Sequence, residues 1–60
     1  MQTIKQQIVE LRKQAQQKMA QLEAAIANND NNRAMELTGE ISNLHTRIAK
    51  LALADLKGSE

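Results

Sequence analysis

The side chains of this 60-residue chain that could take part in chemistry are one histidine and seven carboxylates, and no cysteine is present. Glu36 and Glu40 are one helical turn apart, as in half of a carboxylate-bridged metal site inside a helical bundle. Such a site also needs a Glu-x-x-His pair, whereas His45 lies about 140° around the helix from Glu40. We therefore expect no metal, no cofactor and no enzymatic activity, and a solvated face that both glutamates share with Arg47 and Lys50.

Five consecutive Asn and Asp residues, at 28–32, stand almost at the middle of the chain. A calcium loop would need a central glycine and a closing glutamate at set positions, and these are missing. Asn and Asp accept left-handed backbone conformations and hydrogen-bond their own main chain, so they end and begin helices. We expect a turn at 28–32 in which Asn29 is left-handed and Asp30 or Asn31 caps the next helix.

The segment before this turn has the pattern of one amphipathic helix, from about residue 3 to residue 28. Thr3 and Gln6 have the spacing of a capping box, which satisfies two backbone N–H groups at the start of a helix. Apolar residues then recur every 3.67 residues on average, roughly the period of a straight helix. They form a predicted seam of Ile4, Ile8, Leu11, Ala15, Met19, Leu22 and Ile26.

The segment after the turn predicts a second helix from about residue 31 to residue 57, with a short tail at 58–60 that begins with a helix-stopping glycine. Its apolar residues follow a regular 3-4 repeat: Ala34, Leu37, Ile41, Leu44, Ile48 and Leu51. Folding the chain at the turn places Ile26 beside Ala34 and Met19 beside Ile41. The two seams stay in register, so the sequence predicts an all-α, two-helix antiparallel hairpin that occupies residues 1–60 as one domain.

The second helix carries a further row of residues that one neighbouring helix cannot bury. The row comprises Met35, Thr38, Ser42, His45, Ala49, Leu53 and Leu56. Chains this small need a disulfide, a metal or self-association for stability, and without cysteine or aromatic residues self-association is the remedy left. We interpret the row as the interface of a homo-oligomer, most simply a dimer forming a four-helix bundle, or as a partner surface.

Two residues of the second helix need separate interpretation. His45 borders the seam, and we expect it to make a hydrogen bond across the oligomer interface, with a pH-sensitive contact as the alternative. Gly39 lies inside the helix, where glycine costs about 1 kcal/mol relative to alanine. Its position on the polar face predicts a solvent-exposed site rather than a close approach by a partner backbone.

The charge pattern leaves nucleic-acid binding open as an alternative function. The net charge is only +1 and there are no aromatic side chains on which bases could stack. The first helix nevertheless has a basic edge that could follow a phosphate backbone when doubled by two-fold symmetry. This edge consists of Lys5, Arg12, Lys13 and Gln16.

The sequence therefore predicts a small non-enzymatic protein-interaction module, a regulator or inhibitor of bacterial or phage type that binds a host protein as a homo-oligomer. An RNA- or DNA-binding dimeric hairpin is the first alternative, and an oligomer that binds a small anionic ligand such as a nucleotide is the second. No apolar run is long enough to span a membrane, and the N-terminus lacks the apolar core of a secretion signal. We expect a cytoplasmic protein with no membrane contact.

The predicted plan is similar to that of the Rop family of plasmid copy-number regulators. Those proteins are short helical hairpins that dimerise into a four-helix bundle and bind RNA. The similarity is one of architecture: no motif is shared, and no functional residue is carried over to this chain.

Overall fold

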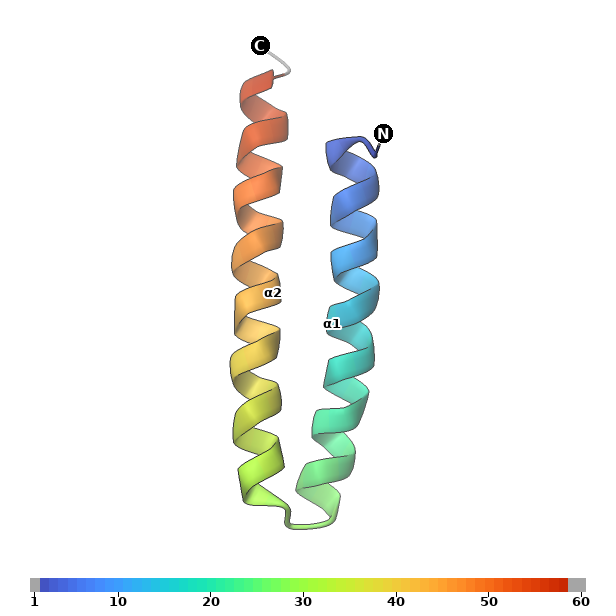
Figure 1. The fold of residues 1–60 in the computed structure, drawn as a ribbon, viewed down its shortest axis with the longest axis vertical. Coiled ribbons are helices and arrows are strands. Elements are labelled where there is room, and N and C mark those ends of the chain that lie inside the picture. Colours follow the sequence, from blue (N-terminus) through green and yellow to red (C-terminus); the bar gives the residue numbers. More distant parts are fainter. Residues whose placement is uncertain (1, 59–60) are drawn as a thin grey trace.

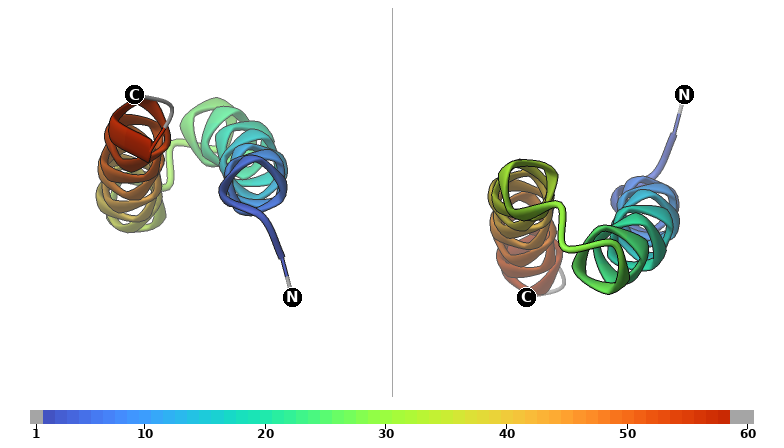
Figure 2. Two further views of the ribbon diagram at one scale, coloured as in Figure 1. Left: turned by 90° about the horizontal axis from the view of Figure 1, so that it is seen from above. Right: turned by 90° about the horizontal axis from the view of Figure 1, so that it is seen from below.

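The computed structural model describes residues 2–58, and they form two antiparallel helices joined by a short turn (Figure 1). Helix α1 spans Ile4–Ala27 and helix α2 spans Asn31–Gly58. The hairpin measures 47 × 16 × 14 Å. Seen from either end, the two helices lie side by side in a single layer, so each has one helical neighbour (Figure 2). The prediction of an all-α helical hairpin is confirmed.

Helix α1 begins at the predicted capping box. The Thr3 hydroxyl accepts a hydrogen bond from the Gln6 backbone N–H at 3.1 Å, and the Thr3 N–H donates to Gln6 Oε1 at 2.9 Å. Two N–H groups that no helical carbonyl can reach are thereby satisfied.

The turn ends α1 with a left-handed residue, as the sequence predicts. Asn29 has a φ of 58°. The Asp30 N–H donates to the Ala25 carbonyl at 2.8 Å and the Asn29 N–H to the Ile26 carbonyl at 3.1 Å, the two bonds of a Schellman motif. Asp30 then caps α2, because its Oδ1 accepts from the Arg33 N–H at 3.2 Å. One short segment thus ends α1 and begins α2.

We expect Asn29→Val to destabilise the hairpin, because a β-branched residue resists the left-handed region. The cost should be about 1–2 kcal/mol, lowering the melting temperature by roughly 4–16 °C in a domain of this size. Asn29→Gly is the matched control and should match or exceed the wild type, since glycine has no Cβ to clash. Thermal unfolding followed by circular dichroism measures both. A valine variant as stable as the wild type would mean that the turn has another backbone conformation.

The C-terminal end of α2 differs from the prediction. Helix α2 continues through Gly58, the residue predicted to stop it, and Gly58 does not adopt a positive φ. A left-handed glycine cap is therefore not formed at Gly58. The rest of the predicted tail, residues 59–60, lies outside the described residues.

The seam between the helices also differs from the prediction in its second half. Met19 and Ile26, predicted to face α2, are 46% and 61% exposed. Lys18 is half-buried and Ala25 is buried, so these residues take the seam positions predicted for Met19 and Ile26, although Ile26 still lines a groove together with Ala34. The physical reason lies in α2, whose strict 3-4 repeat requires a partner stripe of the same period to keep contact over the whole length. Helix α1 meets this requirement with a 3-4 stripe of Ile4, Ile8, Leu11, Ala15, Lys18, Leu22 and Ala25.

The buried core is small and is contributed mainly by α2. Leu37 is fully buried, with 0% of its surface exposed. The other buried apolar residues among those described are Ala15, Ala25, Ile41 and Leu44. Two alanines on the α1 side let the helices approach closely, but they bury little apolar surface.

Gly39 occupies an open position on α2, as predicted. A Cβ built on it would meet nothing within 4 Å. We expect Gly39→Ala to raise stability by about 1 kcal/mol, because alanine restricts the unfolded backbone and favours the helix. Gly58→Ala is the control, since it also points to open space but lies at the helix end, where helix propensity matters less. Chemical denaturation compares the two variants. A loss of stability in Gly39→Ala alone would indicate that a partner backbone contacts this position.

Candidate interaction surface

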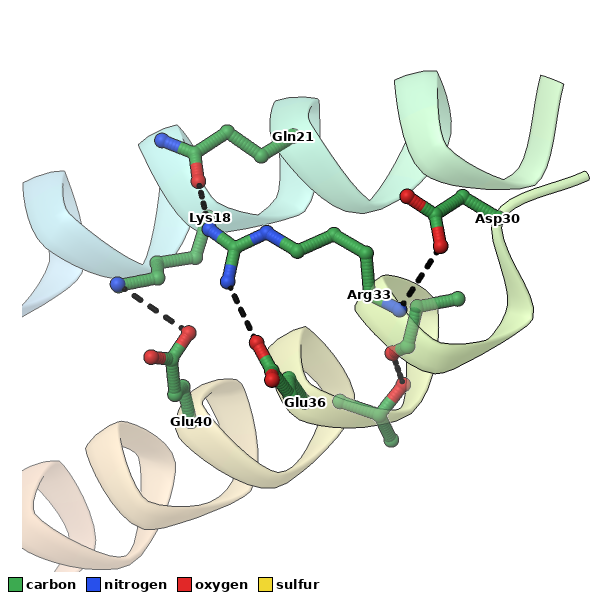
Figure 3. Close-up of polar contacts among 8 residues, drawn as sticks. Lys18, Gln21, Asp30, Arg33, Glu36 and Glu40 are labelled. Carbon is green, nitrogen blue, oxygen red and sulfur yellow. Dashed lines mark hydrogen bonds and ion pairs between the residues drawn. The ribbon is translucent and has the colours of Figure 1, made fainter. Parts of the chain in front are cut away.

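One face of the hairpin is polar and is held by contacts between charged side chains of both helices (Figure 3). Lys18 Nζ lies 3.2 Å from Glu40 Oε2 across the seam. That buried carboxylate oxygen accepts no hydrogen bond of good geometry from the described residues, so the ammonium group is what offsets its burial. The Lys18 stem covers the seam where a larger apolar residue would otherwise be expected.

Arg33 is the second centre of this polar face. Its Nη1 pairs with Glu36 Oε2 at 2.9 Å, and its Nη2 donates to Gln21 Oε1 on α1 at 3.2 Å (Figure 3). Glu40 shares this face with Arg47 and Lys50, which line the same groove, while the ion-pair partners of Glu36 and Glu40 are Arg33 and Lys18. Lys18 reaches Glu40 because its position in the seam directs its side chain toward α2.

The opposite face carries most of the exposed large apolar side chains. Near the turn, a shallow groove is lined by Leu22 and Ile26 of α1 and by Ala34, Met35 and Thr38 of α2. Farther along, a second groove lies between Met19 of α1 and His45, Ile48 and Ala49 of α2. We call this side of the hairpin the apolar face. Its exposed members include Met19 at 46%, Ile26 at 61% and Met35 at 74%.

The row of α2 residues proposed from the sequence lies on or beside this face, and every member is exposed. Leu53 is 58% exposed and Leu56 is 67% exposed. Leu53 stands 18 residues after Met35, which is five helical turns, so both point to the same side of α2. The Thr38 hydroxyl donates to the Ala34 carbonyl at 2.8 Å, which uses its proton inside the helix. Ser42, His45 and Ala49 are exposed between these residues.

Helix α1 supplies a share of the apolar face that the sequence patterns do not predict. The exposed row is predicted on α2 alone because Met19 and Ile26 are expected in the seam. A stricter comparison of periods could have found them, since the repeat of α2 predicts Lys18 and Ala25 as its partners. Met19 and Ile26 then fall one position beyond the seam, on the side of His45 and Met35.

The residues of the predicted basic edge, Lys5, Arg12, Lys13 and Gln16, are all exposed on α1. Arg12 and Gln16 border the groove that contains Met19 and Ala49. Lys13 lies about 100° around α1 from Arg12, on the side turned away from this groove. The basic edge is thus divided between the rim of the apolar face and the outer surface of α1.

Within residues 2–58, no three His, Asp or Glu side chains come together as a set that could hold a metal ion. Neither helix, over its described residues, contains an apolar stretch that could cross a lipid bilayer. Comparison of the chain with protein-family models, with curated proteins and with solved structures gives no match. The similarity in plan to the Rop family accordingly rests on the helical hairpin alone.

Proposed function

We propose that this chain is a small protein-interaction module without enzymatic activity, and that it works as a homodimer. The observation that carries the proposal is the apolar face, on which α1 and α2 both expose large side chains along the hairpin. Scattered exposed apolar residues are normal, but a contiguous apolar patch with polar rims is typical of an interaction surface. Two copies joined by this face would form a four-helix bundle.

The area of this face fits a dimer interface. The hairpin is 47 Å long and 16 Å wide. A side of these dimensions is large enough to contain a standard stable interface, which buries about 800 Å² per partner. A chain with so few buried residues gains a second core by covering this side.

We further propose that the dimer is a cytoplasmic regulator or inhibitor, of the kind found in bacteria and phages, that occupies the surface of another protein. Over residues 2–58 no three His, Asp or Glu side chains gather, which favours action by binding, and a four-helix bundle leaves the outer surfaces of all four helices free for a partner.

Affinity capture with matched variants tests the partner interaction. Wild-type protein, Leu53→Glu and the surface control Gln17→Glu are immobilised and exposed to the same bacterial lysate. We expect a protein retained by the wild type and the control to be lost with Leu53→Glu, because a glutamate in the apolar face dissociates the dimer that presents the partner surface. Equal retention by all three proteins would contradict a function that depends on this face.

Binding of RNA or DNA is the second candidate function, and the exposure of the basic edge favours it. Lys18 and Arg33 form ion pairs, and Lys5, Arg12 and Lys13 are exposed on α1. Retention on immobilised RNA that falls steeply with salt, and that is lost in Arg12→Gln, would support this function. Binding of a small anionic ligand such as a nucleotide stays a prediction, for which a ligand-induced rise in melting temperature is the measurement.

A further inference from the structure

Resting on the proposed dimer, we propose that the second copy lies on the apolar face with its turn at the opposite end. Helix α1 then packs against α1 of the other copy, and α2 against α2, each pair antiparallel. In this arrangement Lys5 of one copy pairs with Glu23 of the other. The inference follows from the positions of two pairs of residues along the hairpin.

The first pair is charged and lies on α1. Lys5 and Glu23 are both exposed and stand 18 residues apart, so after five turns they point to the same side of the helix. That side is close to the side of Met19, which helical geometry places about 40° away. The midpoint between Lys5 and Glu23 along α1 is Gln14.

The second pair is apolar and lies on α2. Met35 and Leu53 are also 18 residues apart and also point to one side of their helix. Their midpoint is Leu44. The Lys18–Glu40 ion pair shows that these two residues are level with each other. Because the helices are antiparallel, four residues back along α1 and four residues forward along α2 bring Gln14 level with Leu44. Gln14 and Leu44 indeed line the same groove on the polar face.

One two-fold axis, perpendicular to the helices at this shared level, therefore brings the members of both pairs opposite each other across the two copies. It places Lys5 opposite Glu23 of the second copy and Met35 opposite Leu53 of the second copy, with each contact repeated by symmetry. Packed helices are about 8–10 Å apart, a distance that a lysine and a glutamate side chain span together. The charges of Lys5 and Glu23 are thus complementary to those of the same two residues in a reversed copy.

The arrangement with both turns at the same end does not bring opposite charges together. There α1 would face α2 of the second copy, and Lys5 would lie near Leu53, whereas Glu23 would lie near Met35. No residue of opposite charge stands at those positions on α2. Charge complementarity therefore distinguishes the two ways of joining the hairpins.

Charge reversal tests the proposed arrangement. We expect Lys5→Glu and Glu23→Lys each to raise the dissociation constant of the dimer about tenfold at low salt, because two symmetry-related pairs become repulsive. The double variant should return to within about twofold of the wild type, since the pair is restored with its signs exchanged. Lys13→Glu is the control, because it makes the same change in charge on the outer side of α1.

These variants should fold, which keeps the test decisive. A glutamate in the first turn of α1 and a lysine near its last turn both complement the helix dipole. A dimer whose dissociation constant responds equally to Lys5→Glu and Lys13→Glu, with no recovery in the double variant, would overturn the proposed arrangement while leaving the dimer itself intact. A monomeric wild-type protein would overturn the dimer as well.

Cross-linking supplies an independent measurement, since the chain has no cysteine of its own. Met35→Cys and Leu53→Cys are mixed and treated with a short bifunctional maleimide. We expect a cross-linked dimer that contains one copy of each variant, and little product from either variant alone, because like positions lie at opposite ends. Failure of the mixed pair to cross-link in a protein that sediments as a dimer would contradict the arrangement.

Discussion

Leu37→Ala is expected to unfold much of the protein at room temperature. Leu37 is the largest side chain that is fully buried among the described residues, at 0% exposure. Shortening a buried leucine to alanine costs about 2–5 kcal/mol, from lost transfer free energy and the remaining cavity. A core of this size rarely supplies more than about 3–5 kcal/mol in total. Urea denaturation at a fixed protein concentration measures the loss.

The matched control for this prediction is Val9→Ala. Val9 is 50% exposed on α1, so its truncation should lower the free energy of unfolding far less than that of Leu37. Both variants remove apolar atoms from a helix, but only one removes them from the core. If Leu37→Ala were as mild as Val9→Ala, the packing of α1 against α2 around Leu37 would be wrong.

Met35→Glu is expected to convert the dimer into a folded monomer. Met35 is 74% exposed in the single hairpin, where a glutamate near the start of α2 is compatible with the helix. In the dimer the same carboxylate would be taken from water without a partner, at a cost of several kcal/mol for each copy. The dissociation constant should therefore rise by at least about 100-fold, as light scattering over a dilution series can measure.

Two further variants test whether dissociation of the dimer depends on where the negative charge is placed. Leu53→Glu should dissociate the dimer in the same way, because Leu53 lies on the same side of α2. Gln17→Glu, which adds the same charge at an exposed position of α1, should leave the dimer unchanged. A dimer that tolerates both Met35→Glu and Leu53→Glu would have its interface elsewhere on the hairpin.

The local features of this fold could be predicted from the sequence because each depends on a few neighbouring residues. The capping box of Thr3, the left-handed Asn29 and the cap formed by Asp30 all involve contacts within one turn of backbone. Such contacts follow from the conformational preferences of the residues themselves. The regular repeat of α2 likewise identified Leu37, Ile41 and Leu44 as its buried residues.

The second half of the α1 seam could not be predicted by hydrophobicity alone. Met19 and Ile26 are more apolar than Lys18 and Ala25, so a search for apolar residues selects them. The choice depends instead on the period of the partner helix and on Glu40, which gives Lys18 a counter-charge at 3.2 Å. Both are contacts between residues far apart in the chain. The apolar face was consequently assigned to one helix, although two helices build it.

Sedimentation equilibrium of the wild-type protein at micromolar concentration tests the central claim that the apolar face binds a second copy. The account predicts a species of twice the 6.7 kDa chain mass, with helical circular dichroism and a melting temperature that rises with protein concentration. A single 6.7 kDa species that is fully helical and melts at the same temperature at every concentration would contradict it.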